Sequence, residues 1–340
     1  MANIKDLAEK TGLSVATVSR VFNDIDKVSP KTRALVLKIA KELNFRPNKM
    51  ASALRSGKSK TIGVVVPVID RDVFSAAIKS MEEVFREAGY HIIIAQSHES
   101  HEKEIEIIEN LKQLRVDGII ISVSKKTQAI EALEQAKKEG IGIVLFDRTL
   151  EMASTNSIII NNFKGAVQAT EHLLAEGCKR IIHLAGNEAV SIFKERKRGF
   201  ELAMQEAGIK TDTHSIIDFD DGKLTGLALL KEQMSGDAPP DGIFAHGDIS
   251  ALVAIQLLRD MKLRIPQDVA IVGFGESSFC PYVEPALTSI SQRSEDVGKL
   301  AAEIMLKELQ TKNKDELVYS QQMLAPHLMI RQSSQRKQDQ

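Results

Sequence analysis

Tryptophan is absent from this 340-residue sequence, cysteine occurs only twice, and aromatic residues make up 4% of the chain. With so few rings, the hydrophobic core must be built mainly from aliphatic side chains. Cys178 and Cys280 lie far apart and fit no spacing typical of a metal or redox site. We therefore expect two reduced thiols in a cytosolic protein.

Long apolar runs and catalytic motifs are also missing. The sequence contains no run of about 18 apolar residues that could form a membrane span. The segment MANIKDLAEK lacks the basic and apolar regions of a secretory signal. Neither a serine elbow nor a phosphate-binding P-loop occurs, and the lone Gly-Phe-Gly at 273–275 is too weak to indicate a nucleotide site. His98 and His101 stand three residues apart, whereas the zinc-protease pattern needs a spacing of four. We expect a solvated loop there, and no enzyme activity, cofactor or metal.

Charge is distributed unevenly along the chain. The formal net charge is −1, from 45 basic and 46 acidic residues. Residues 1–60 nevertheless hold 13 basic and five acidic residues, a net charge of +8, so the other 280 residues carry −9. A basic N-terminal segment on an acidic body favours a polyanion as the partner of that segment. On charge alone, a chance fluctuation is the alternative.

From Thr61 onward, apolar runs alternate with amphipathic segments. Four segments have the continuous aliphatic character of buried strands: TIGVVVPVI, YHIIIAQS, VDGIIISVS and IGIVLFDR. The segments between them have apolar residues at helical spacing. After NSIIINN the alternation begins again. The pattern predicts two α/β units in tandem, each a parallel sheet with helices on both faces. Because such sheets bind ligands at the carboxyl ends of their strands, two facing sheets would form a cleft for a small molecule.

The basic N-terminal segment contains a helix-turn-helix pattern. We expect a helix over residues 4–11, a turn at Gly12, and a second helix from Val15 after the capping residue Ser14. A third helix is predicted in SPKTRALVLKIAKELN, with Pro30 in its first turn. The second helix of such a motif enters the major groove of DNA. A plain helical hairpin has the same local pattern, but the positive charge favours DNA binding.

These motifs resemble the LacI/GalR family of bacterial transcription regulators over essentially the whole chain. The similarity lies in IKDLAEKTGLSVATVSRVFN and VSPKTRALVLKIAKELNFRPNKMASALRSGKSKTIGVVVP, then in RVDGIIIS, LFDR, ERKRGFELAMQEAG, IPQDVAIVGF and PALTSI, in that order. The resemblance implies an all-α DNA-binding head, made of a three-helix helix-turn-helix and a hinge helix. It implies that this head is joined to a two-lobed α/β domain with two parallel sheets, like periplasmic sugar-binding proteins.

The resemblance also implies domain boundaries. Residues 1–47 would form the helix-turn-helix domain, with the motif at about 4–23, and 48–60 the hinge helix and linker. Residues 61–340 would bind the effector and form the dimer. Their N-terminal lobe would take about 61–160 and 291–320, and their C-terminal lobe about 161–290 and 321–335.

The residues implied to read DNA lie mostly on the second helix. Arg20 can make two hydrogen bonds to guanine, whereas Val15 and Ala16 offer only apolar surface, as to thymine methyl groups. Ser29 is a phosphate candidate that could instead only cap the third helix. The implied phosphate contacts are Thr17, Ser19, Asn23, Ser29 and Thr32.

The hinge segment NKMASALRSG is implied to order on DNA as a short helix. Leu54 would enter the minor groove as an apolar wedge that kinks the duplex, with Ala51 on the same face and Arg55 in or beside the groove. From the sequence alone, Leu54 could simply be a linker residue that packs on the body.

Charged residues at strand ends form the implied effector site. Asp147 ends LFDR, Arg196 lies in R-x-x-G-F, and Asp248 opens a helix, so each could hold ligand hydroxyl groups by charge-assisted hydrogen bonds. Phe74 and Phe219 would supply apolar faces. Arg196 could alternatively make a surface ion pair, and Asp248 could also cap its helix.

The chain departs from the family pattern after VAIVGF. Many family members carry an aspartate there that reaches the ligand, whereas this sequence has Gly275 followed by Glu276. Either Glu276 acts from the neighbouring position, or the ligand differs in shape or charge.

Taken together, the resemblance implies a transcription regulator, a repressor that binds double-stranded, pseudo-palindromic operator DNA as a homodimer in the cytoplasm, at the nucleoid. A sugar-like small molecule in the cleft would switch it. Two alternatives stay open. The same regulator could be controlled by a protein co-regulator, or the chain could bind a small molecule without transcriptional switching.

Overall fold

The chain folds into two compact units, Met1–Lys60 and Thr61–Gln340. This computed structural model describes residues 3–23, 28–45, 58–127, 130–212, 214–219, 224–311, 313 and 316–336. No helix among these residues has both the length and the apolar character needed to cross a membrane.

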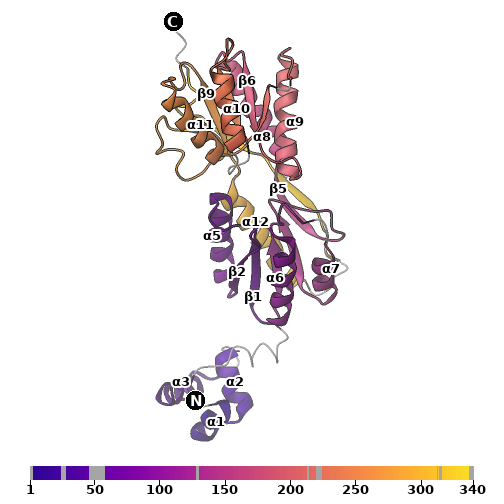
Figure 1. The fold of residues 1–340 in the computed structure, drawn as a ribbon. Helices are drawn as coiled ribbons and strands as arrows, with labels where there is room; N and C mark the ends of the chain where they lie inside the picture. The colour runs from indigo at the N-terminus through magenta and orange to yellow at the C-terminus, as the bar shows by residue number, and fades with distance from the viewer. Residues whose placement is uncertain are drawn as a thin grey trace. The chain divides into compact units, whose positions relative to one another are not determined.

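The first unit contains the three expected helices (Figure 1). The Asn3 side chain accepts hydrogen bonds from the backbone of the first turn of α1, and Gly12 ends α1 in the left-handed conformation, with φ of 66°. Leu7, Val18 and Val36 are fully buried, one from each helix, so the core is the aliphatic one that the composition predicts. The helices are α1 (Ile4–Thr11), α2 (Val15–Asn23) and α3 (Pro30–Glu42).

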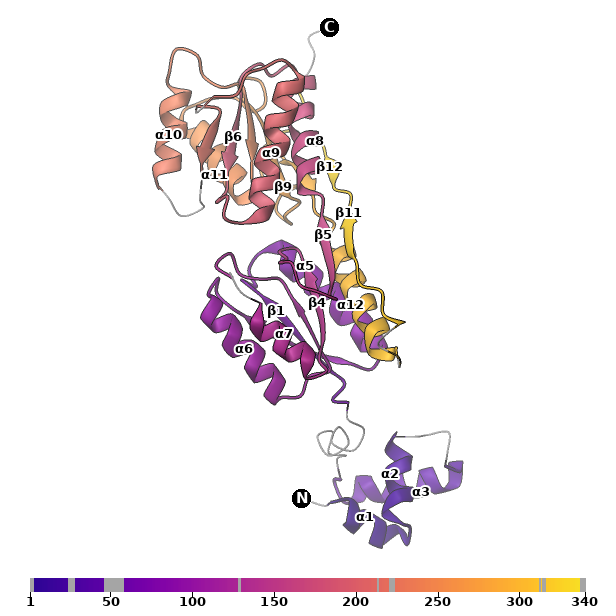
Figure 2. The same cartoon turned by 90° about the vertical axis from the view of Figure 1, so that its right-hand side faces the viewer.

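The second unit begins with an α/β lobe, the N-lobe, whose six-stranded sheet has the order β11-β5-β4-β3-β1-β2 (Figures 1 and 2). All its strand pairs are parallel. Ile62 and Val64 of β1 pack with α5 and α12, while Val65 packs on the opposite face with α6 and α7. Both faces are therefore buried, which is why the strands read as continuous aliphatic runs. The elements are β1 (Thr61–Val66), α5 (Asp72–Glu87), β2 (His91–Gln96), α6 (His101–Gln113), β3 (Gly118–Ile121), α7 (Glu131–Lys138), β4 (Gly142–Phe146), β5 (Asn156–Ile160), α12 (Ser294–Gln310) and β11 (Gln321–Leu324).

The other lobe, the C-lobe, repeats this architecture with the strand order β12-β10-β9-β8-β6-β7. Ala166 of α8 and Phe200 of α9 pack in one core cluster, while Leu230 of α10 and Leu258 of α11 pack in another. The elements are α8 (Asn162–Ala175), β6 (Ile181–Ala185), α9 (Ser191–Glu206), β7 (Ile216–Asp218), α10 (Leu224–Met234), β8 (Gly242–Ala245), α11 (Asp248–Asp260), β9 (Ala270–Gly275), β10 (Thr288–Ser291) and β12 (His327–Met329).

Within the described residues, the chain crosses between the lobes three times, after β5, after β10 and after β11 (Figure 2). The strand β11 pairs with β5 in the N-lobe sheet, so the last crossing follows Leu324, and the expected lobe boundary at residue 320 needs correction. The strand β12 pairs antiparallel with β10, an exception to the two parallel sheets that we expected. Its direction follows from the crossing after β11. The chain enters the C-lobe at the carboxyl ends of that lobe's parallel strands, so β12 starts at those ends and runs antiparallel to β10.

A close helix contact supports the wall of the N-lobe next to the cleft. A Cβ atom at Gly298 of α12 would overlap the Ala77 carbonyl of α5, so glycine lets the two helices approach closely. The Ser80 hydroxyl also donates a hydrogen bond to the Glu295 carbonyl over 2.8 Å. These contacts hold α5, whose first turn faces the cavity described below.

Candidate DNA-reading helix and ligand cavity

The exposed and buried faces of α2 separate as expected. Val15, Ala16 and Arg20 are exposed, whereas Val18 and Val21 are 0% and 3% exposed in the core of the head. A helix cannot place all five residues on one side, so the buried valines fix the direction in which Arg20 projects. One cationic and two small apolar side chains are thus available on the outer face.

Two hydroxyl pairs mark the starts of α2 and α3. The Ser14 hydroxyl accepts the Thr17 backbone N–H over 3.1 Å and lies 2.9 Å from the Thr17 hydroxyl. Ser29 repeats this arrangement with Thr32, at 3.2 Å and 2.8 Å. Ser29 is therefore an N-cap, as one of its two interpretations required. The side chains of three phosphate candidates, Thr17, Ser19 and Thr32, are half-buried.

Part of the predicted DNA surface lies outside the described residues. This applies to the hinge residues Ala51, Leu54 and Arg55, and to the side chain of Asn23. Their roles stay predictions.

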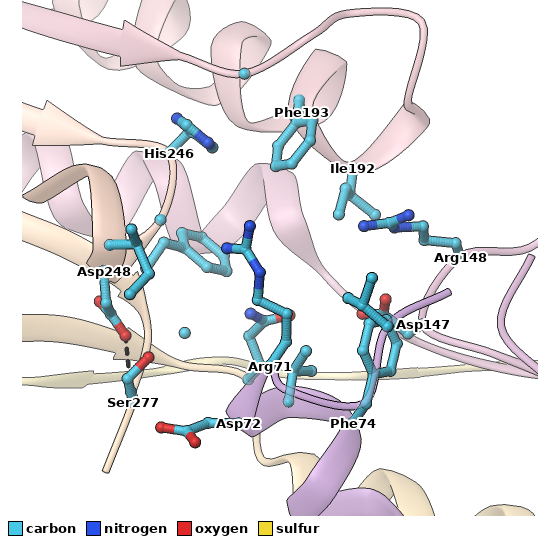
Figure 3. A pocket seen from close by; sticks show the side chains of 18 of the residues that line it. Arg71, Asp72, Phe74, Asp147, Arg148, Ile192, Phe193, His246, Asp248 and Ser277 are labelled. Atoms are coloured by element: carbon cyan, nitrogen blue, oxygen red, sulfur yellow. Dashed lines mark hydrogen bonds between the residues drawn. The ribbon is translucent and has the colours of Figure 1, made fainter. Parts of the chain in front are cut away.

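A cavity of about 470 Å³ lies between the lobes of the second unit (Figure 3). Its residues come from the segments that follow the carboxyl ends of strands in both sheets, as the rule for open α/β sheets requires. In Figure 3, Phe74, Asp147 and Arg148 lie on one side, and His246, Asp248 and Ser277 lie on the other. Four of the six implied effector residues line this cavity: Phe74, Asp147, Arg196 and Asp248.

Arg196 is a deeply buried charge in the cavity wall. It is 3% exposed, its Nε donates to Asn162 Oδ1 over 2.9 Å, and its Nη1 donates to the His246 carbonyl. The guanidinium carbon lies 3.6 Å from the centroid of the Phe274 ring. Burial lowers the pKa of Arg196 to about 9, although the neighbouring Asp147 raises it. The alternative of a surface ion pair is therefore excluded.

Asp248 is held rigidly at the start of α11. Its Oδ1 accepts the Ser289 hydroxyl over 2.6 Å, and its Oδ2 accepts the Ser277 backbone N–H over 2.7 Å. A Cβ at Gly273 would overlap Oδ1, and one at Gly275 would lie 2.9 Å from Oδ2. The Gly-Phe-Gly run thus leaves room for a carboxylate of the chain itself.

Asp147 directly follows β4 and has a positive φ of 58°. Burial raises the pKa of Asp147, and the charges of Arg148 and Arg196 oppose this rise. The charges of one guanidinium group from each lobe therefore act on this carboxyl group.

Sequence reasoning missed an ion pair in the cavity wall. The Nη1 atom of Arg148 donates to both carboxylate oxygens of Glu99, over 2.8 Å and 3.0 Å. The same carboxylate accepts the backbone N–H of Lys125 over 2.8 Å, and all three residues line the cavity. Arg148 directly follows Asp147, so the strand-end rule could have identified it. The cavity also contains other residues that the sequence did not suggest, among them Phe193, His246, Phe274 and Gln292.

Two implied effector residues need correction, because neither lines this cavity. Phe219 is 4% exposed and packs in the C-lobe core with Ile217 and Leu230. The carboxylate of Glu276 instead accepts hydrogen bonds from both terminal nitrogens of Arg331. This pairing favours the interpretation that the ligand differs in shape or charge.

The histidine and cysteine side chains discussed in the sequence analysis have the following surroundings. Among the described residues, no group of three or more His, Cys, Asp or Glu side chains could hold a metal ion. His98 is exposed and within hydrogen-bond distance of the Gln96 amide, 2.7 Å from its Nε2. Cys178 and Cys280 are free and buried, and burial raises the pKa of Cys178 to about 12.

A basic helix-turn-helix unit and a two-lobed unit with an interlobe cavity together define a DNA-binding regulator with a ligand-binding domain. Residues 3–48 match the bacterial regulatory proteins of the lacI family, and residues 170–334 match the periplasmic binding protein-like domain. The HTH-type transcriptional repressor PurR of Photobacterium profundum is 32% identical over 333 residues, 98% of each chain. The HTH-type transcriptional regulator RegA of Clostridium saccharobutylicum is 33% identical over 334 residues, 98% of this chain and 99% of RegA. The chain therefore belongs to the lacI family of bacterial regulatory proteins and is a transcription regulator, which confirms the resemblance inferred from its motifs.

A solved structure agrees with this assignment. The structure of the transcriptional regulator CelR–cellobiose complex is 27% identical in sequence to this chain, with a TM-score of 0.70. The match covers 98% of this chain and 100% of the CelR chain.

Proposed function

We propose that this protein is a cytoplasmic repressor that binds a pseudo-palindromic operator at the nucleoid as a homodimer, and that a neutral, polyhydroxylated small molecule in the interlobe cavity switches it. The single observation that carries the proposal of a switch is a cavity lined by charged strand-end residues from both lobes. A ligand that contacts both lobes has a different affinity for different lobe arrangements, and only this difference can shift the equilibrium between them.

The outer face of α2 supports the DNA-reading role of the head. Arg20 is the base-reading cation, and Val15 and Ala16 contact thymine methyl groups. Thr17, Ser19, Asn23, Ser29 and Thr32 position the head on phosphates. The hinge residues Ala51, Leu54 and Arg55 contribute minor-groove contacts and bending.

The charges in the cavity favour a neutral ligand. Its lining contains five carboxylates and four cationic side chains, a formal balance of −1. Arg148 is already paired with Glu99, and the charges of Asp147 and Asp248 act on Arg196. A phosphorylated ligand would add negative charge to a lining whose formal balance is already −1. Carboxylates and guanidinium groups, by contrast, suit hydroxyl groups as acceptors and donors.

Aromatic faces support the same class of ligand. Phe193 lines the cavity and is only partly buried, so its ring can offer apolar surface to the carbon face of a sugar ring. Phe74 and Phe274 lie in the cavity wall, where they are 1% and 2% exposed. The relative CelR was solved in complex with cellobiose, which is a neutral sugar.

Calorimetric titration of the full-length protein tests the ligand class. Neutral mono- and disaccharides are compared with the matching sugar phosphates at one pH and salt concentration. We expect the neutral sugars to bind. Each matching phosphorylated sugar should bind at least about tenfold more weakly, a difference of about 1.4 kcal/mol in the free energy of binding. Tighter binding of a phosphorylated compound would contradict the proposed ligand class, and a shift of operator affinity only by a protein from the cell would favour a co-regulator.

Replacing Arg20 with alanine is expected to weaken operator binding by about 1–3 kcal/mol and to relax base preference at one position in each half-site. Quantitative gel shifts on operators with single base changes measure both effects. Lys10→Ala serves as a control, since Lys10 lies on the preceding helix α1. A uniform loss across all sequences after Arg20→Ala would assign Arg20 to phosphate binding instead.

A further inference from the structure

One hydrogen bond joins the two lobes directly across the cavity. The Ser278 backbone N–H, in the loop after β9 of the C-lobe, donates to Asp72 Oδ2 of the N-lobe over 2.6 Å. Both residues line the cavity, and 206 positions separate them in the chain. Asp72 is half-buried and Ser278 is exposed, so the bond lies at the solvent-accessible edge of the cavity.

The C-lobe presents this N–H group from a loop that its own contacts hold in place. The Glu276 N–H donates to the Ser289 hydroxyl over 3.0 Å, and the Ser277 N–H donates to Asp248 Oδ2 over 2.7 Å. The Cys280 N–H closes the turn on the Ser277 carbonyl over 2.9 Å. The backbone N–H groups of Glu276 and Ser277 thus bond within the C-lobe, whereas the next one, that of Ser278, donates to a carboxylate of the N-lobe.

In the N-lobe, the acceptor Asp72 is held at the start of helix α5. Asp72 is the first residue of α5, and its backbone carbonyl accepts the Ser75 hydroxyl over 3.2 Å. The residue before it, Arg71, makes no side-chain capping bond to α5. Phe74, which lines the cavity, lies on the same helical turn as Asp72. A change in lobe angle that moves Phe74 relative to the C-lobe therefore also changes the distance between the Asp72 acceptor and Ser278.

We propose that the hydrogen bond between Asp72 and Ser278 is an interlobe latch, which stabilises the lobe arrangement seen here from groups of the chain alone. We call this the latched arrangement. Since neither partner belongs to a ligand, the latch shifts the lobe equilibrium whether or not the cavity is filled. A ligand that prefers the latched arrangement therefore binds more tightly the larger the latched population is, and a ligand that prefers another arrangement binds more weakly.

The latch can be tested on the free full-length protein by fluorescence energy transfer between the lobes. Dyes are attached at Lys103→Cys in the N-lobe and Lys210→Cys in the C-lobe, both exposed positions, whereas the native cysteines are buried. Labelled chains are mixed with an excess of unlabelled chains so that a dimer with any labelled chain carries one dye pair.

We expect Asp72→Ala to lower the ratio of latched to unlatched molecules about tenfold, as loss of a hydrogen bond to a charged acceptor does. Asp72→Asn keeps the shape and one acceptor oxygen, so it should have a smaller effect in the same direction. The matched control is Asp70→Ala, because Asp70 also lines the cavity but no hydrogen bond or ion pair joins it to another described residue.

Hydrogen exchange at the Ser278 amide gives a second measurement on the same variants. Faster exchange at this amide in Asp72→Ala and Asp72→Asn, and unchanged exchange in Asp70→Ala, is the expected result. Identical lobe distances and identical exchange in the wild type and both Asp72 variants would overturn the latch. Because neither measurement needs DNA or a ligand, such a failure would leave the proposed repressor function untouched.

Discussion

Replacing Arg196 with alanine is expected to lower the free energy of unfolding of the two-lobed unit by about 3–5 kcal/mol, because two buried acceptors lose their donor and a large buried side chain is removed. The guanidinium of Arg196 lies over Phe274 and donates to Asn162 and the His246 carbonyl. Alanine leaves both acceptors without this donor and leaves an unfilled space above the ring. It also removes the cation whose charge opposes those of Asp147 and Asp248.

Urea denaturation of the full-length protein measures this change in the free energy of unfolding. Arg198→Ala is the matched control, because Arg198 lies on the same helix but its side chain is 57% exposed and pairs with Glu195. An exposed pair of this kind contributes about 0–1 kcal/mol. If Arg196→Ala were no more destabilising than Arg198→Ala, the buried arginine would not organise the cavity as described.

The isolated head, residues 1–60, is expected to bind a full operator about 10²–10⁴-fold more weakly than the full-length protein at the same salt concentration. The head forms a compact unit of its own, so it retains the face of α2 that reads DNA. What it loses is the proposed dimer, which presents two heads to half-sites about one helical turn apart (~34 Å).

A single half-site provides the control for this comparison. On DNA with only one half-site, the full-length protein should lose most of its advantage over the head, because only one head can bind specifically. Equal affinity of the two proteins for the full operator would rule out cooperation between two heads. Both comparisons need fixed salt, since phosphate contacts make the affinity strongly salt-dependent.

The sequence was sufficient for those parts of the fold that repeat a simple period. The alternating aliphatic and amphipathic segments predicted the parallel sheets and their covering helices, and the cap at Ser14 placed the start of α2. The short strands β11 and β12 gave no such signal, because exposed and half-buried residues alternate along these edge strands. Their pairing, and with it the last lobe crossing, depends on contacts distant in the sequence.

The cavity shows the same division. The rule that ligands bind at strand ends located Asp147, Arg196 and Asp248, because these residues follow strands or open helices. It failed for Glu276, whose partner Arg331 lies 55 residues away. Glu99 was missed for a similar reason, because its partner Arg148 lies 49 residues away in the sequence. Glu99 also has a left-handed backbone conformation, which the sequence does not indicate because the residue is not glycine.

The most direct test of a ligand-switched, DNA-reading dimer is selection of bound DNA from a random duplex pool by the full-length protein, with and without the neutral sugars that bind it. We predict enrichment of an inverted repeat whose half-sites lie about one helical turn apart, and a change in the amount of that DNA recovered when the sugar is added. Recovery of a single unrepeated site, or of no preferred sequence, would contradict the dimer that reads an operator. Recovery that is identical with and without a bound sugar would contradict the switch.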